Sequence, residues 1–294
     1  MVAAALAGAV FTAVGIVVRQ RATMDVPADR GVSTLMLNTL LRRPLWWAGT
    51  GAAVTGYAFQ AVALTYGSLI LVAPLLVSAL LFALPLSAWQ SHRKVTGAEW
   101  GWAVLLTGSL AAFVALARTK PGDYEGAGRE AVWVAVLSLA GVAVLLILTR
   151  KVTGWRRALA LAVCVGVLFG VVAVLTKIDT HILTTEGLLT VWTSPVNYAL
   201  IVIAVAATLL QQSAFHAGSL QASVPAMLVL EPLVAVLLGS VVLGEHLEVG
   251  RNSAIALAVS VVAMAAATIA LGRDEGAFED RLEAAAHRSA TDRA

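Results

Sequence analysis

The sequence has little charge and almost no cysteine. Charged residues make up 13% of the 294 residues, and the single cysteine is Cys164. A soluble domain usually carries about 25% charged residues, so the composition argues against a soluble protein. One cysteine excludes a disulfide within the chain and any metal site built from several thiolates.

The sequence also lacks the motifs of nucleotide-driven and hydrolytic chemistry. It has no phosphate-binding glycine loop, no zinc-ligand pattern and no nucleophile elbow. We therefore expect no enzyme activity and no cofactor. The excess of Lys and Arg lies in the loops, where it reports orientation in a membrane rather than nucleic-acid binding.

Apolar residues, in contrast, are abundant at 60% of the chain. A helix needs about twenty apolar residues to cross the hydrocarbon core, and several runs reach that length. The sequence predicts an all-α polytopic membrane protein with about nine transmembrane helices. Segments 31–43 and 182–193 are too short to cross and are expected to be interfacial or re-entrant. The nine predicted spans are 2–19, 46–66, 68–90, 98–118, 131–149, 155–177, 197–216, 221–243 and 252–272.

The loop charges predict an orientation. Most of the 20 Lys and Arg residues fall on one side of the nine spans. The positive-inside rule then places the N-terminus outside and the C-terminus in the cytoplasm of a multi-pass protein of the cell (inner or plasma) membrane. The polar tail 273–294 is expected to be cytoplasmic and disordered, or else a short surface helix.

Two sets of residues match at nearly constant spacing and predict an inverted repeat. The first repeat falls within 1–120, a spacer helix within 121–152 and the second repeat within 153–272, which is a 4+1+4 arrangement. One spacer helix after four spans reverses the second half, and secondary transporters commonly have this plan. Chance similarity is the alternative. The matching residues are Gly8, Phe11, Arg19, Gln60, Gly67-Ser68-Leu69 and Pro74 with Gly166, Phe169, Lys177, Gln211, Gly218-Ser219-Leu220 and Pro225.

Glu231 is the only one of the 17 acidic residues that lies deep inside an apolar span. A carboxyl group there costs about 2.5–3.5 kcal/mol unless it is protonated, paired or hydrated. Pro232 follows directly and frees a backbone carbonyl, which favours a local polar spot. Glu231 is thus the candidate proton- or cation-coupling group. The alternative is a protonated carboxyl that only bonds a neighbouring helix.

Four further polar residues are candidates for a solute site. Gln60 and Gln211 are related by the repeat, Gln212 follows Gln211, and His216 lies one turn later. Amides in lipid need partners, so they should face the bundle interior and either bind solute or clamp helices together. His216 would line the cytoplasmic mouth or simply be hydrated.

Prolines and terminal cations give a further set of candidates. Pro74, Pro225 and Pro232 predict helix breaks, and matching breaks in two repeats indicate a binding site. Arg19 and Lys177 end matching spans, either as snorkelling anchors or as gates.

Two more features of the second half lead to expectations about packing and exposure. Asp179 is expected at the outer surface. The pair Gly166 and Gly170 predicts close packing of two helices.

Three runs carry a family resemblance. They are the Gly-x-x-Phe helix that ends in Arg or Lys, the run Ala-Leu-Thr-Tyr-Gly-Ser-Leu at 63–69, and Leu230-Glu231-Pro232 followed by Leu243-Gly244-Glu245. They resemble the EamA-type pattern of the drug/metabolite transporter superfamily, across both halves. This resemblance implies a secondary transporter but no particular solute.

A second resemblance lies within that superfamily. The run Arg43-Pro44-Leu45-Trp46-Trp47-Ala48-Gly49 and the later Leu71-Val72-Ala73-Pro74-Leu75 resemble the NIPA-type magnesium transporters. The EamA pattern has ten spans, and its second span is replaced here by segment 31–43.

Three functions stay open at this point. The first is a carrier of a small solute, in which Glu231 alternates between a protonated and a substrate-paired state. The second is magnesium transport, with Glu231 and Gln60 or Gln211 around a hydrated ion, although the metal ligands are otherwise unknown. The third is a non-transporting scaffold that works through 273–294. Expected partners are membrane lipid and a small solute or cation, and a homodimer is compatible with the sequence.

Overall fold

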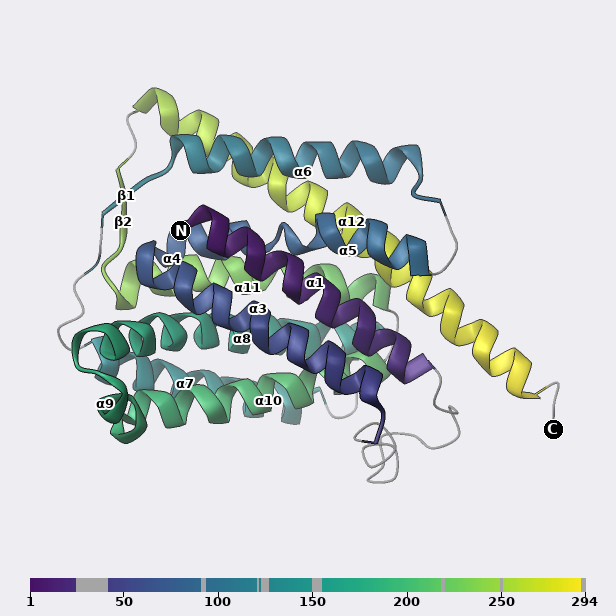
Figure 1. Ribbon diagram of the computed structural model, residues 1–294, viewed down its shortest axis with the longest axis horizontal. Helices are drawn as coiled ribbons and strands as arrows, with labels where there is room; N and C mark the ends of the chain where they lie inside the picture. The colour runs from purple at the N-terminus through teal and green to yellow at the C-terminus, as the bar shows by residue number, and fades with distance from the viewer. Residues whose placement is uncertain are drawn as a thin grey trace.

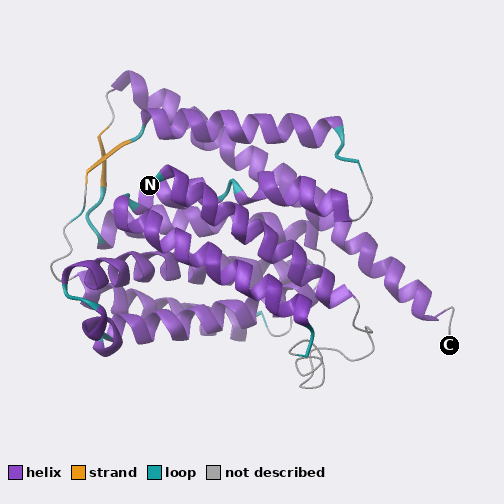
Figure 2. Cartoon of the chain, viewed as in Figure 1, coloured by secondary structure: helices purple, strands orange, loops and turns teal. Residues whose placement is uncertain are grey.

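The apolar runs of the sequence form long helices, and the computed structural model is a bundle of them with a short two-stranded ribbon at one end (Figure 1; Figure 2). The structure describes residues 1–24, 42–90, 94–120, 122, 127–149, 155–217, 220–248 and 251–291. The elements are α1 (Val2–Met24), α3 (Pro44–Tyr66), α4 (Leu69–Leu76), α5 (Ala79–Gln90), α6 (Gly97–Leu116), β1 (Arg118–Lys120), α7 (Ala127–Leu148), α8 (Trp155–Thr185), α9 (Leu188–Thr193), α10 (Pro195–Ala217), α11 (Leu220–Val242), β2 (His246–Glu248) and α12 (Arg251–Thr291).

Six stretches of helix in the described part of the chain are long and apolar enough to cross a membrane. Their outward surface is apolar too, because side chains such as Leu137 and Val241 are 66% and 77% exposed. A bilayer solvates such surface, whereas water does not. The chain is therefore a helical multi-pass membrane protein. The six stretches are Leu69–Trp89, Gly97–Leu116, Ala127–Leu148, Arg156–Thr185, Pro225–Val242 and Ser253–Arg273.

The span predicted at 68–90 consists of two helices. α4 ends two residues after Pro74, and a turn at Val77 and Ser78 separates it from α5. The Ser78 hydroxyl donates to the Leu75 carbonyl at 2.6 Å, so the turn satisfies one of the carbonyls released at the helix end. The predicted break near Pro74 is thus present.

The breaks predicted at Pro225 and Pro232 are wrong. Both prolines lie inside α11, which runs without interruption from Leu220 to Val242. Helices in a membrane tolerate proline because neighbouring helices can satisfy the freed carbonyls. Pro225 packs closely on α12, where a Cβ atom on Gly272 would lie 3.2 Å from the Pro225 Cα.

α8 is the central helix and packs against both α10 and α11. A Cβ atom on Gly166 or Gly170 would lie 2.6 Å from the Cβ of Leu230 or Val234 on α11. Only glycine fits at these two positions, so the close packing predicted from Gly166 and Gly170 is confirmed.

β1 and β2 pair in antiparallel fashion, with Arg118 opposite Glu248 and Lys120 opposite His246. We call the end of the bundle that carries β1, β2 and the α3–α4 turn at Gly67 and Ser68 the ribbon end (Figure 1). β1 follows α6 and β2 precedes α12, and α6 and α12 also pack on one another. The ribbon thus joins two helices that are far apart in sequence.

Two predicted helix boundaries need correction. α8 continues to Thr185, eight residues past Lys177, so the segment 182–193 is not one short helix but the last turn of α8, a bend and α9. Gly187 makes the bend, with a φ of 91° that favours glycine. Predicted segment 31–43 lies outside the described residues, apart from its last two.

The tail is helical. Of the two forms expected for it, disorder or a short surface helix, disorder is wrong for the backbone up to Thr291, because α12 continues that far. The segment is rich in Ala, Glu and Arg, which have high helix propensity, and it extends a helix that is already nucleated.

Candidate functional site

Glu231 lies on α11 at the contact with α8. A Cβ atom on Gly166 of α8 would be 3.4 Å from the Glu231 backbone nitrogen, so the two backbones are close here. The residue is half-buried, and its carboxyl group interacts electrostatically with the Tyr57 hydroxyl of α3. The predicted deep acid therefore lies among α3, α8 and α11.

Tyr57 belongs to the same region, and the sequence analysis missed it. Its hydroxyl lies beside the Thr176 hydroxyl of α8, which itself donates to the Val172 carbonyl at 2.7 Å. Tyr57 is 40% exposed, whereas Thr176 is only 4% exposed. The one signal available in sequence was that Tyr57 lies one turn before Gln60 on an apolar helix. We call Glu231, Tyr57 and Thr176 the Glu231 cluster.

The predicted amides are not brought together. Gln60 is half-buried on α3, one turn from Tyr57. Gln211 is half-buried on α10, a helix that packs mainly on α8 and α7. The side chains of Arg19, Gln212 and His216 lie outside the described residues.

Lys177 forms a second polar region at the ribbon end. It is 7% exposed, and its ammonium group donates to the carbonyls of Leu64 and Gly67, the latter at 2.7 Å. These carbonyls belong to the last turn of α3 and the turn after it, where a cation complements the helix dipole. The interpretation of Lys177 as a snorkelling anchor is therefore wrong, because α8 continues beyond it and α3 covers it.

Glu245 completes this second region, and the sequence analysis did not select it. It is 0% exposed, and its two carboxylate oxygens accept from the Leu69 and Ile70 backbone N–H groups at 3.0 and 3.1 Å. Burial raises the pKa of Glu245, while these two N–H groups and the charge of Lys177 oppose the increase. The acid thus caps the N-terminus of α4, as a carboxylate favours.

The backbone around Glu245 explains how the side chain reaches α4. Gly244 has a φ of 64°, which reverses the chain just after α11. The Glu245 N–H then donates to the Gly239 carbonyl at 3.1 Å. The sequence signal for this arrangement was the pair Gly244-Glu245 directly after an apolar span. We call Lys177, Glu245 and the turn residues 64–70 the turn lock.

Asp179 is half-buried and lies two residues past Lys177, within α8. One of its carboxylate oxygens, Oδ1, is buried and has no hydrogen-bond partner among the described residues. The expectation that Asp179 lies at the outer surface stays a prediction. Asp179 follows Thr176 by one helical turn, so both side chains lie on the same side of α8.

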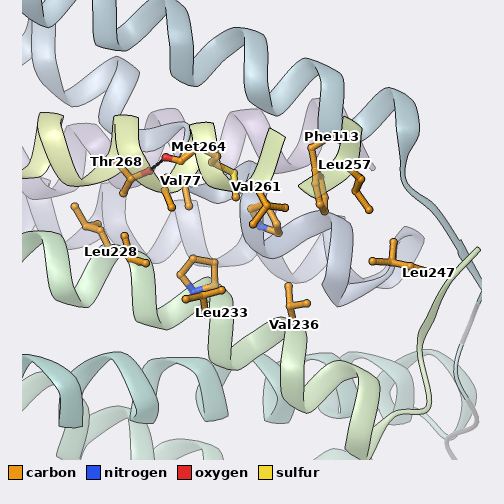
Figure 3. Close-up of a pocket in the computed structure, with 14 residues that line it drawn as sticks. Val77, Phe113, Leu228, Leu233, Val236, Leu247, Leu257, Val261, Met264 and Thr268 are labelled. Carbon is orange, nitrogen blue, oxygen red and sulfur yellow. Dashed lines mark hydrogen bonds between the residues drawn. The ribbon is translucent and has the colours of Figure 1, made fainter. Parts of the chain in front are cut away.

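A separate apolar cavity of about 130 Å³ lies between α4, α6, α11 and α12 (Figure 3). Pro74 and Pro232 both line it, on α4 and α11. Its one polar lining side chain, Thr268, donates its hydroxyl proton to the Met264 carbonyl at 2.8 Å. The cavity therefore suits apolar groups, and Glu231 is not among the residues that line it.

The comparisons with known proteins identify one relative. A protein of Corynebacterium glutamicum described as uncharacterised is 39% identical over 272 residues, which cover 92% of this chain and 93% of the relative. The chain belongs to the same family as this corynebacterial protein. No family model matches the chain, and no solved structure matches it.

The two polar regions of this chain differ in what they can do. The two charged side chains of the turn lock are buried and bonded to backbone, so they hold two helix ends together. The Glu231 cluster places a buried carboxyl group near a tyrosine hydroxyl, and either group can accept or donate a proton. Among the described residues, no group of three His, Cys, Asp or Glu side chains lies close enough to hold a metal ion.

Proposed function

We propose that the chain is a secondary transporter of the drug/metabolite type, which moves a small solute by alternating access and uses Glu231 as its proton- or cation-coupling group. The observation that supports this best is the position of Glu231 among α3, α8 and α11. The carboxyl group is buried in the middle of an apolar helix and within electrostatic range of the Tyr57 hydroxyl. Intramembrane acids usually have a functional role, because their insertion is costly.

The chemistry of the Glu231 cluster fits such a role. A carboxyl group in an apolar bundle is stable either as the neutral acid or when paired with a cation. Exchange between these two forms couples release of a proton to binding of a second ligand. Tyr57 supplies a hydroxyl group for a solute, next to the Thr176 hydroxyl.

The proposal includes nine spans arranged as a 4+1+4 inverted repeat. Each predicted span coincides with a helix, or with the pair α4 and α5. Equivalent helices of the two halves also meet, since α4 packs on α11 and α6 packs on α12. Such pairs are expected around an axis in the membrane plane. The proposed orientation has the ribbon end outside and the C-terminus in the cytoplasm.

Transport in proteoliposomes tests the role of Glu231. Solutes are first ranked by the thermal shift that they produce, and the best is added to proteoliposomes that contain a trapped pH indicator. We expect Glu231→Gln to abolish the solute-dependent pH change, whereas Glu186→Gln, at an exposed position between α8 and α9, leaves it intact. Full proton-coupled flux in Glu231→Gln contradicts the proposal.

A further inference from the structure

The turn lock connects the two halves of the chain at the ribbon end. Lys177 of α8 holds the carbonyl end of α3, and Glu245 after α11 holds the N–H end of α4. The four backbone groups lie within seven residues, from Leu64 to Ile70. Both charged side chains come from the second half of the chain, and the turn that they bind comes from the first.

Other bonds close the same end. The Ser68 hydroxyl, in the middle of the turn, donates to the Thr119 hydroxyl of β1 at 3.0 Å. β1 pairs with β2, whose Glu248 forms an ion pair with Lys120 at 2.5 Å. The turn, the ribbon and the charged side chains of the second half are therefore one connected set of polar contacts at the ribbon end.

We propose that the Lys177–Glu245 turn lock is the gate of the transporter at the ribbon end, and that the structure shows this gate closed. This inference rests on the proposed function, because a carrier must open at one end of the bundle at a time. Opening here has to separate the α3–α4 turn from α8 and from the end of α11. Water would then replace the protein groups as partners of Lys177, Glu245 and the four backbone groups.

The arrangement suits a gate better than a permanent clamp. Each contact joins a side chain to the backbone of a turn rather than to the middle of a helix, so separation leaves the α3 and α4 ladders intact. All the groups involved are charged or strongly polar, so water can solvate them once they separate. Apolar packing alone would leave no such alternative partner.

Access of a membrane-impermeant maleimide to a cysteine in the Glu231 cluster tests the gate and needs no known solute. Cys164→Ala provides the background, and Tyr57→Cys is the reporter. Lys120→Cys, on the exposed ribbon, marks the vesicle face that carries the ribbon end. The rate of labelling is measured from each face in sealed vesicles of both orientations.

We expect Glu245→Gln to raise the labelling rate from the ribbon face about tenfold, because it weakens two charge-assisted bonds at the turn. Glu186→Gln is the matched control, since it removes an exposed acid between α8 and α9 that has no part in the turn lock or the ribbon, and it should leave the rate unchanged. Oxidation of a Ser68→Cys/Thr119→Cys pair, added to Glu245→Gln, should restore the slow rate, and a reductant should reverse this.

Two results overturn the gate. One is an unchanged ribbon-face rate in folded Glu245→Gln, and the other is an equal increase from both faces, which indicates a loosened bundle. If Glu245→Gln does not fold, Glu245→Asp keeps the charge with a shorter reach and should give about a threefold increase at the ribbon face alone. If the gate fails this test, the flux test of Glu231 can still support the transporter, and if the flux test fails, the labelling test can still be carried out.

Discussion

The Lys177 ammonium group donates to the carbonyl of Leu64, which lies 113 residues earlier in the chain. The same group donates to the Gly67 carbonyl at 2.7 Å, and its charge attracts Glu245. One side chain thus links α8 to the end of α3 and to the acid that caps α4.

Replacement of Lys177 should therefore be costly. We expect Lys177→Met to lower the free energy of unfolding by about 3 kcal/mol, since it leaves a buried acid unpaired and two carbonyls without a donor. Lys120→Met is the control, because Lys120 pairs with Glu248 on the exposed ribbon, and exposed pairs contribute about 0–1 kcal/mol. Thermal unfolding in detergent measures both, and similar midpoints for the two variants would contradict the assigned bonds.

Gly170 should tolerate no larger side chain. A methyl group there would meet the Val234 side chain at 2.6 Å, so we expect Gly170→Ala to separate α8 from α11 and to cost about 1–3 kcal/mol. Gly141 on α7 has no atom within 4 Å of the equivalent position. Gly141→Ala should then be neutral or stabilise the helix by up to about 1 kcal/mol, as its higher propensity predicts. The same unfolding midpoint for both variants would show that the α8–α11 contact is not tight.

Tyr57 should contribute to transport through its hydroxyl. We expect Tyr57→Phe to reduce flux about tenfold, because the ring stays and a polar contact in an apolar setting is lost. Tyr198→Phe, on α10 and 57% exposed, is the control and should keep normal flux. Proteoliposome flux with the solute selected for the Glu231 test decides between them. Equal flux in the two variants would remove Tyr57 from the proposed site.

The apolar cavity should accept additional side-chain volume. Ala265 lines this cavity of about 130 Å³, so we expect Ala265→Leu to raise the free energy of unfolding by about 0.5–2 kcal/mol. Ala254→Leu on the exposed side of α12 adds the same volume without filling the cavity and should change little. A decrease in the midpoint for Ala265→Leu would mean that the space is too narrow for three more carbon atoms.

The sequence alone predicts the helices well, because long apolar runs have no other stable form in a bilayer. It also predicts the tight contact at Gly166 and Gly170, since small residues four apart leave a flat helix face. Helix ends were harder to predict. α8 continues past Lys177 because α3 and the end of α11 supply partners for the charge, and nothing local to residue 177 indicates this.

Glu245 shows a second limit of prediction from sequence, because its partners are distant in the chain. Its position after an apolar span gives it the appearance of a loop residue, and its burial depends on N–H groups 175 residues away. Tyr57 was missed because an aromatic residue on an apolar helix is usually a packing residue. Glu231 was found because a charge inside an apolar run is unusual regardless of tertiary structure.

The ribbon has a mechanical consequence. β1 begins two residues after the end of α6, and β2 ends three residues before the start of α12. Backbone hydrogen bonds therefore fix the spacing between the ends of these two helices, which also touch along their length. If either helix tilts, the other must tilt with it. α6 and α12 would therefore move as one rigid unit relative to the rest of the bundle.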